Sequence, residues 1–344
     1  MKFKLAFIGF GVVGQGLAEI LLEKKRELEE NHGFEYDIVA ISDMNKGSVY
    51  AENGLDMTKV MDMVSEDVSL EEYPEGIKGW NPIKTIRETN ADTIVEVTYT
   101  DMKTGGPALE HVRTALKAGK HVVSTTKGPV AVAAVELTEL ARRNHVQYRF
   151  EGTVLSGTPS INLAWETLAG CEIKEIKGIV NGTTNYILSK MEEGMEYEEA
   201  LEKAQELGYA EADPTGDVEG IDAQGKMLIL SNTVMGADIT LDDVARKGIT
   251  GISLKDVEDA KKEGFRWKLI GSTKKTEGGI EAGVGPEKIP MDHPLAGVMG
   301  PTNALTFSTD LLGDVTIVGP GAGKKETGFS LLIDILAINK SMEG

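Results

Sequence analysis

The 344-residue sequence contains one cysteine, Cys171, and only five histidines. A single cysteine cannot form a disulfide within the chain, and it excludes zinc or iron–sulfur sites built from several cysteines. The histidines never occur at the spacing typical of metal ligands. They are His32, His111, His121, His145 and His293. We therefore do not expect a zinc-dependent mechanism.

The sequence also lacks long apolar runs and an excess of basic residues. No stretch reaches the ~18 consecutive apolar residues of a transmembrane helix, and the N-terminus runs directly into strand-like sequence instead of a secretory signal. Asp and Glu number 55 against 36 Lys and Arg, a net charge of −19. Such a charge repels phosphate backbones and anionic lipids. We expect a soluble, cytoplasmic protein that binds neither nucleic acid nor membranes.

The order of the predicted elements indicates two domains and a C-terminal helix. Over residues 1–150, short apolar runs alternate with amphipathic stretches, such as the helix expected at 13–30, which predicts a doubly wound, Rossmann-type α/β sheet. Residues 46–81 are polar and irregular, which predicts one helix and an irregular segment outside the regular alternation of strands and helices. Longer strands and helices over 151–318 predict an α+β domain, and the helix within 319–344 is expected to pack back on the first domain.

A G-x-G-x-x-G motif follows the first predicted strand and opens the first helix. Glycines at these positions allow a tight turn and a close approach of the backbone, and the helix N-terminus then faces a pyrophosphate. In this context the motif predicts dinucleotide binding by residues 1–150. Its residues are Gly9, Phe10, Gly11, Val12, Val13 and Gly14.

Two further positions at strand ends bear on the cofactor. Asp43 ends the second strand, where an acidic residue binds a ribose 2′-hydroxyl and favours NAD. Lys46 and Lys59 follow and could instead neutralise the 2′-phosphate of NADP, and Asp43 could equally be a turn residue. Lys127 lies at the end of a later strand, where it meets a ligand or is an ordinary surface lysine.

The segment 207–226 is the richest in charged groups. Its loop, flanked by glycine and proline, suits an amine ligand. Asp222 and Lys226 lie four residues apart, so on a helix they share one face, either as a surface pair or as a carboxylate that holds a general acid. The carboxylates are Glu211, Asp213, Asp217, Glu219 and Asp222.

Two glycine-containing segments lie near the expected domain boundaries. Residues 151–159 join a strand to a helix and predict either a hinge or a set of carbonyl oxygens that, with Glu151, coordinate a hard cation. Residues 319–323 (GPGAG) form a glycine-rich turn before the last helix, which could close over the nicotinamide.

Taken in order along most of the chain, these motifs resemble those of the homoserine dehydrogenases. The sequence departs from the pattern of some members in having no C-terminal regulatory extension, so we expect no ACT domain. The motifs are GFGVVG at 9–14, TTKGP at 125–129, EGTVLSGTP at 151–159, NGTTN at 181–185, LGYAEADP at 207–214, DVEGIDAQGK at 217–226 and GPGAG at 319–323.

The resemblance implies reversible, NAD- or NADP-dependent reduction of L-aspartate 4-semialdehyde to L-homoserine, for threonine, methionine and isoleucine biosynthesis. It assigns Glu211 and Asp217 to the substrate, Asp222 to the orientation of the substrate or a water, and Lys226 to proton donation. Because no zinc site is expected, a lysine must neutralise the alkoxide, and Lys127 is the other candidate. Residues 151–318 become the substrate-binding, catalytic and dimerisation domain of a homodimer.

The same resemblance supplies two ligand sets. It places the cofactor on Phe10, Val12, Val13, Thr98, Lys127 and Gly323, in addition to Gly9, Gly11, Gly14 and Asp43, which the motif and the strand end already indicate. A sodium ion is expected on Glu151 and the backbone carbonyls of Val154, Ser156 and Thr158.

Two other functions stay open at this point. One is a different Rossmann dehydrogenase that acts on another small amino-acid aldehyde. The other is a regulator that senses a dinucleotide without turnover, although such a protein has no use for the carboxylate loop and Lys226.

Overall fold

The computed structural model describes residues 2–342, which divide into two compact units. The first runs to Gly157 and resumes at Gly323, and the second spans Thr158–Ala322. Both boundaries between the units lie later in the sequence than the predicted domain boundaries, which were placed after residues 150 and 318. The backbone N–H of Glu151 donates to Asp334 Oδ2 (2.9 Å), which keeps residues 151–157 with the first unit. The last strand of the second unit continues to Pro320.

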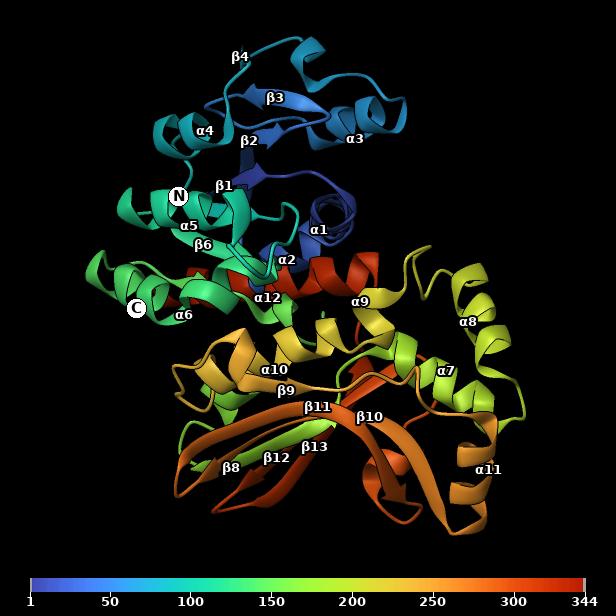
Figure 1. Ribbon diagram of the computed structural model, residues 1–344. Coiled ribbons are helices and arrows are strands. Elements are labelled where there is room, and N and C mark those ends of the chain that lie inside the picture. The colour runs from blue at the N-terminus through green and yellow to red at the C-terminus, as the bar shows by residue number, and fades with distance from the viewer. Residues whose placement is uncertain (1, 343–344) are drawn as a thin grey trace. The chain divides into compact units, whose positions relative to one another are not determined.

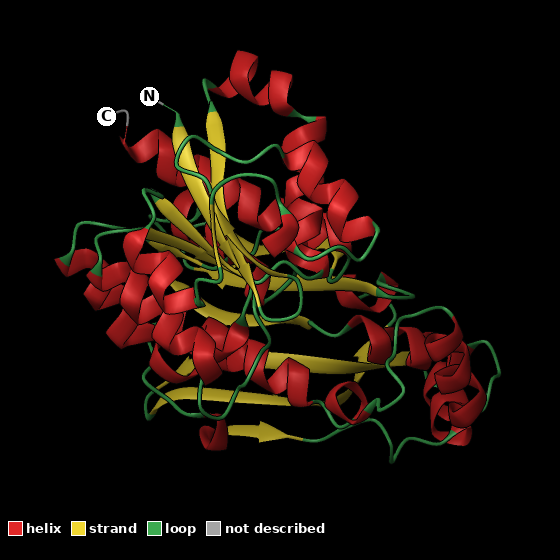
Figure 2. Cartoon of the chain, turned by 90° about the horizontal axis from the view of Figure 1, so that it is seen from above, coloured by secondary structure: helices red, strands yellow, loops and turns green. Residues whose placement is uncertain are grey.

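The first unit is built on a seven-stranded sheet of order β4-β3-β2-β1-β5-β6-β7. The five strands from β2 to β7 are parallel, whereas β3 and β4 extend the sheet antiparallel beyond β2. Helices cover both of its faces, as a doubly wound fold requires (Figure 2). The strands are β1 (Phe3–Ile8), β2 (Tyr36–Asp43), β3 (Gly47–Tyr50), β4 (Ile77–Lys78), β5 (Thr93–Glu96), β6 (His121–Ser124) and β7 (Tyr148–Arg149).

The C-terminal helix α12 belongs to this unit and packs on α1 (Figure 1). A Cβ atom at Gly16 would lie 2.3 Å from the carbonyl oxygen of Lys324, so glycine lets the two helices approach closely. Leu331 and Ile335 of α12 enter the same core as Leu17. The helices are α1 (Val12–Glu23), α2 (Lys25–His32), α3 (Met57–Ser65), α4 (Pro82–Glu88), α5 (Gly106–Lys117), α6 (Lys127–Arg143) and α12 (Lys324–Met342).

The second unit holds a six-stranded sheet of order β13-β12-β8-β10-β11-β9. All neighbours are antiparallel except β11 and β9, and β10 and β11 form a long hairpin in register from Phe265↔Pro290 to Thr276↔Gly279. The strands are β8 (Ile173–Ile179), β9 (Val244–Arg246), β10 (Phe265–Thr276), β11 (Gly279–Pro290), β12 (Thr302–Thr309) and β13 (Gly313–Pro320).

Helices α7 and α10 pack on one face of this sheet (Figure 1). Met227 of α10 lies so close to β10 that a Cβ atom at Gly271 would be 2.6 Å from its sulfur. Most of α10 is buried, including Lys226. The helices are α7 (Gly182–Glu192), α8 (Tyr197–Glu206), α9 (Thr215–Val218), α10 (Ile221–Thr233) and α11 (Leu254–Lys262).

Two predicted elements of the first unit differ in the structure. The helix expected at 13–30 is two helices, because Lys24 leaves the helical conformation at φ −103°, ψ 9°. The irregular stretch 46–81 contains the strands β3 and β4 as well as α3. Nowhere in residues 2–342 is a helix both long and apolar enough to cross a membrane.

Candidate functional site

The glycine motif forms the turn between β1 and α1. Gly9 has φ +88°, and a Cβ atom there would lie 2.6 Å from the carbonyl oxygen of Val97, so the position requires glycine. Gly11 is the N-cap of α1, and a Cβ atom there would meet nothing within 4 Å. The open space before the helix N-terminus suits a phosphate group.

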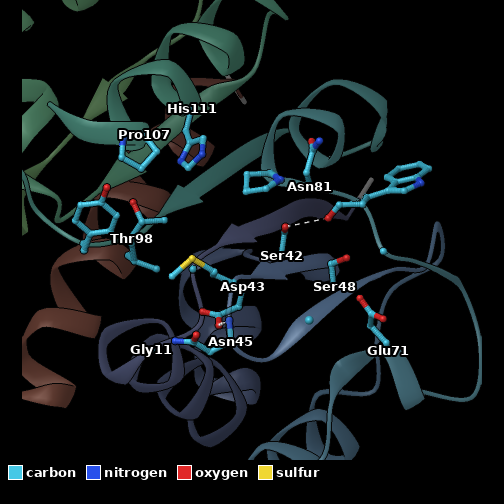
Figure 3. A pocket seen from close by; sticks show the side chains of 18 residues that line it. Gly11, Ser42, Asp43, Asn45, Ser48, Glu71, Asn81, Thr98, Pro107 and His111 are labelled. Carbon is cyan, nitrogen blue, oxygen red and sulfur yellow. Dashed lines mark hydrogen bonds between the residues drawn. The ribbon is translucent and has the colours of Figure 1, made fainter. Parts of the chain in front are cut away.

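A cavity of about 660 Å³ opens beside this turn (Figure 3). The ends of β1, β2 and β5 form its floor. The N-terminal halves of α4 and α5 contribute Pro82, Pro107 and His111, and the β2–β4 region forms a further wall. It is lined by Gly9, Gly11, Ser42, Asp43, Met44, Asn45, Gly47, Ser48, Glu71, Gly79, Trp80, Asn81, Pro82, Val97, Thr98, Tyr99, Pro107 and His111. A pocket at the carboxyl ends of parallel strands, where the strand order reverses, is the usual dinucleotide site of this fold.

Asp43 connects the glycine turn to the turn after β2. Its Oδ2 accepts a hydrogen bond from the N–H of Phe10 (2.7 Å), and its Oδ1 accepts from the N–H groups of Asn45 (2.9 Å) and Lys46 (3.0 Å). Burial raises the pKa of Asp43, but the three backbone donors and the charge of Lys46 outweigh it and hold that pKa below its usual value. Asp43 is therefore an anion within the cavity wall.

The residues predicted for the cofactor separate into two groups. Gly9, Gly11, Asp43 and Thr98 line the cavity. The side chain of Phe10 does not, because it is fully buried in the core against Phe7. Only the backbone of Phe10 faces the turn. The other predicted contacts lie outside the lining, namely Val12, Val13, Gly14, Lys127 and Gly323.

The second unit contains a cluster of charged side chains around α10. The Lys226 ammonium lies 2.7 Å from Asp222 Oδ2 and donates a 2.7 Å hydrogen bond to the backbone carbonyl of Val180. Only 8% of the Lys226 side chain is exposed. These contacts hold the ammonium in a defined position.

Asn181 brings a second carboxylate into this cluster. Its Nδ2 donates to Asp217 Oδ1 (2.6 Å) and to Asp222 Oδ2 (3.2 Å), while its Oδ1 caps α7 by accepting from the N–H of Thr184. Burial raises the pKa of Asp217, the Asn181 hydrogen bond lowers it, and the charge of Asp222 raises it, so the net shift is upward. Two carboxylates and one ammonium leave the cluster net negative while both acids are ionised.

The other predicted site residues are Glu211, Lys127 and the sodium ligands. Glu211 is exposed, in the loop after α8, and its backbone carbonyl accepts a hydrogen bond from Gln205. Lys127 is the first residue of α6 and belongs to the first unit, whereas Lys226 belongs to the second. Of the predicted sodium ligands, only Thr158 belongs to the second unit, and the other three lie in the first. Within the described residues, no three His, Cys, Asp or Glu side chains are grouped to hold a metal ion.

Sequence reasoning missed several residues of both sites. Asn181 is the first residue of the NGTTN motif and the N-cap of α7. An asparagine at the start of a predicted helix was the available signal for this residue. The cavity wall from the β2–β4 region was missed because residues 46–81 carry no clear periodicity. Trp80, which stacks on Tyr50 (5.3 Å between ring centroids), came from that stretch. Ser48, Glu71 and Asn81 came from it as well.

Comparison with known proteins identifies the family. The homoserine dehydrogenase model matches residues 159–336, and the model of the homoserine dehydrogenase NAD binding domain matches residues 9–151. The chain belongs to the homoserine dehydrogenase family. It is thus an NAD(P)-dependent oxidoreductase that acts on a CH–OH group, and the family implies a role in amino-acid biosynthesis.

Three members of the homoserine dehydrogenase family show how far the similarity extends. An NAD(+)-dependent homoserine dehydrogenase of Pseudomonas canavaninivorans is 44% identical over 341 residues, covering 99% of this chain and 97% of the relative. A homoserine dehydrogenase of Methanocaldococcus jannaschii is 43% identical, covering 98% of each chain. The solved structure of a hyperthermophilic archaeal homoserine dehydrogenase in complex with NADPH is 31% identical, with a TM-score of 0.84, and the match covers 99% of this chain and 98% of that one.

Proposed function

We propose that this chain catalyses the reversible reduction of L-aspartate 4-semialdehyde to L-homoserine with Lys226 as the proton donor. The observation that carries this proposal is the Lys226 ammonium, buried and held at 2.7 Å by both Asp222 and the Val180 carbonyl. The product would serve threonine, methionine and isoleucine biosynthesis. Both substrate and cofactor are soluble, which favours the cytoplasm.

The residues suit the proton transfer in both directions. The nicotinamide cofactor supplies or accepts the hydride when bound. As the aldehyde carbon is reduced, negative charge develops on its oxygen, and an ammonium within hydrogen-bonding distance donates the proton. In the reverse direction, the neutral amine of Lys226 takes the proton from the homoserine hydroxyl. Asp222 keeps the side chain oriented, and burial limits competition from water.

The charge of the cluster suits an amino-acid substrate. Asp217 and Asp222 both accept hydrogen bonds from Asn181, so the cluster offers two carboxylates that can bind a positively charged group. The α-ammonium of homoserine supplies that charge. We assign it to Glu211 and Asp217, with Glu211 as the exposed carboxylate that the substrate meets from solvent.

We propose NAD as the preferred cofactor. Asp43 and Glu71 are both carboxylates of the cavity wall, and the described lining residues include neither lysine nor arginine. The Lys59 ammonium, one candidate to neutralise a 2′-phosphate, lies over the ring of Tyr73, 5.7 Å from its centroid. Lys46 contributes a backbone N–H to Asp43. A 2′-phosphate would thus meet the negative charges of Asp43 and Glu71, which the charge of Lys46 beside Asp43 offsets only in part.

We also propose the sodium site and the homodimer. A carboxylate combined with carbonyl oxygens suits a hard cation. Glu151 is 1% exposed, and Ser156 adopts φ +54°, a backbone conformation that non-glycine residues rarely adopt. These features fit a cation held by Glu151 and the carbonyls of Val154, Ser156 and Thr158. Replacing Na⁺ by choline should lower the unfolding temperature of the wild type but not of Glu151→Gln. Light scattering should give the mass of a dimer, paired through the second unit.

The test of the function is the formation of reduced nicotinamide from L-homoserine. NAD⁺ and NADP⁺ are compared at equal concentration, with L-serine and D-homoserine as controls. We expect turnover of L-homoserine, with the larger kcat/KM for NAD⁺. Binding of NAD⁺ without turnover of L-homoserine would contradict the proposal and favour a dinucleotide sensor. Turnover of a different amino alcohol instead would favour another dehydrogenase of an amino-acid aldehyde.

A further inference from the structure

The carboxylate of Glu96 is buried beneath the dinucleotide cavity and accepts several hydrogen bonds. Glu96 ends β5, and its side chain is fully inaccessible to solvent. Its Oε1 accepts from the Thr98 hydroxyl (2.5 Å) and from the Thr98 N–H (3.3 Å). Burying a carboxylate is costly unless donors surround it, so this arrangement needs an explanation.

The second oxygen of Glu96 extends the network to the next strand end. Oε2 accepts from the hydroxyl of Ser124, the last residue of β6 (3.2 Å). Ser124 Oγ in turn accepts from the N–H of Thr126 (3.0 Å), and the Thr126 hydroxyl donates to the Thr98 carbonyl (3.3 Å). Thr126 is the N-cap of α6, immediately before Lys127. One carboxylate thus joins the two loops that carry the predicted cofactor residues Thr98 and Lys127.

A histidine beside this carboxylate also lines the cavity. His111 Nδ1 lies 3.5 Å from Glu96 Oε1, and 7% of the His111 side chain is exposed. Thr98 and His111 lie on the cavity wall in Figure 3, with Pro107 beside His111. The carboxylate therefore lies behind two of the groups that face the ligand.

The hydrogen bonds determine how Thr98 can interact with a ligand. A hydroxyl has one hydrogen to donate and two lone pairs. Because Thr98 donates its hydrogen to Glu96, it presents only lone pairs to the cavity. The ribose hydroxyls and the carboxamide NH₂ of a nicotinamide cofactor are donors and match those lone pairs.

We propose that Glu96 is a positioning residue of the dinucleotide site, which fixes the Thr98 hydroxyl as an acceptor and aligns the loops after β5 and β6. This inference rests on the proposed use of NAD, because it concerns how the same cavity recognises that cofactor. Glu96 acts through Thr98 and Ser124 and does not touch the ligand itself.

The test is the dissociation constant of NAD⁺, measured by calorimetry for Glu96→Gln, Thr98→Val and the double variant. Glutamine keeps the shape of glutamate, but its NH₂ can donate to Thr98 and reverse the hydroxyl. We expect each single variant to bind NAD⁺ about tenfold more weakly, as for the loss of a hydrogen bond. The double variant should bind no more weakly than either single one, because both changes remove the same interaction.

Two control variants separate positioning from stability. Thr93→Val removes a buried hydroxyl from the same strand, one without a hydrogen-bond partner, and should leave the dissociation constant unchanged. Thr98→Ser keeps the hydroxyl and should bind NAD⁺ with the dissociation constant of the wild type. In steady state, Glu96→Gln should raise KM for NAD⁺ and leave KM for homoserine unchanged.

Wild-type NAD⁺ binding by Glu96→Gln with a lowered unfolding temperature would overturn the proposal and assign Glu96 a structural role only. If Glu96→Gln does not fold, Ser124→Ala is used, with an expected weakening of about threefold, and wild-type affinity in that variant would contradict the proposal. Failure of the proposed function is distinguishable, because it would appear in the wild type as absent homoserine turnover.

Discussion

The Lys226 ammonium lies 2.7 Å from Asp222 Oδ2, one helical turn earlier on α10. The spacing alone allowed an ordinary surface ion pair, which contributes little to stability. The exposed fractions, 8% for Lys226 and 23% for Asp222, exclude that interpretation. A charged pair taken out of water is costly to maintain. We therefore propose that this pair, beside Asn181 and Asp217, serves catalysis rather than stability.

The exposed carboxylate of Glu211 should affect substrate binding more than the chemical step. Glu211→Ala should raise KM for homoserine about tenfold with kcat nearly unchanged, since the ammonium contact is present in the ground and transition states alike. Cofactor affinity should not change. Asp213→Ala is the matched control, because Asp213 is exposed in the same loop and accepts from the N–H of Thr215. Equal effects of the two substitutions on KM would contradict the assignment.

Asp43 should determine the choice between NAD and NADP. Asp43→Ala should raise the NADP/NAD ratio of kcat/KM about tenfold, or about 1.4 kcal/mol, because a negative charge leaves the cavity wall. It should also lower the unfolding temperature, since the N–H groups of Phe10, Asn45 and Lys46 lose their acceptor.

Glu71→Gln serves as the companion variant, because it removes a charge from the same wall and leaves these backbone hydrogen bonds intact. The ratio should rise about threefold, as expected for a more exposed charge, without loss of stability. An unchanged ratio in both variants would show that this wall does not face the ribose.

Lys268 should make stability depend on pH above neutrality. Burial lowers its pKa to about 8, against an unfolded value of about 10.4. The unfolded chain therefore binds more protons in that interval, and the stability contribution of Lys268 rises as pH increases. We expect the difference in the free energy of unfolding between the wild type and Lys268→Met to rise by about 2 kcal/mol between pH ~7.5 and pH ~10.

The measurement is urea denaturation of both proteins over this range. Lys262→Met is the control, because Lys262 is exposed and paired with Asp259 at 3.0 Å. A wild-type pH dependence parallel to that of Lys268→Met would show that the Lys268 pKa is close to normal. The charged lysine is tolerated because its ammonium donates to Asn185 Oδ1 (2.8 Å) and to the Val298 carbonyl (2.6 Å).

The sequence was sufficient for those features that depend on local pattern. The G-x-G-x-x-G turn was predictable because its glycines meet local requirements. Gly9 has a positive φ, and Gly11 leaves open space in front of the helix. The i,i+4 relation of Asp222 and Lys226 followed from helix geometry. The two-domain organisation followed from a change in the order of strands and helices.

Features that depend on contacts between distant segments could not be predicted. Strands β3 and β4 are only 4 and 2 residues long, and they exist because they pair antiparallel beyond β2. Asn181 joins Asp217 and Asp222 across 36 and 41 residues. Phe10 was predicted as a cofactor residue from its motif position, which does not tell that its ring is buried and that only its backbone faces the turn.

The most direct test of the account is the kcat of Lys226→Ala for homoserine oxidation, measured beside Lys127→Ala. If Lys226 exchanges the proton with the substrate oxygen, kcat should fall by roughly 10²–10⁴, with a smaller change in KM and unchanged NAD⁺ affinity. Near-normal kcat in Lys226→Ala, with turnover lost in Lys127→Ala while cofactor still binds, would contradict the account and transfer the role to Lys127.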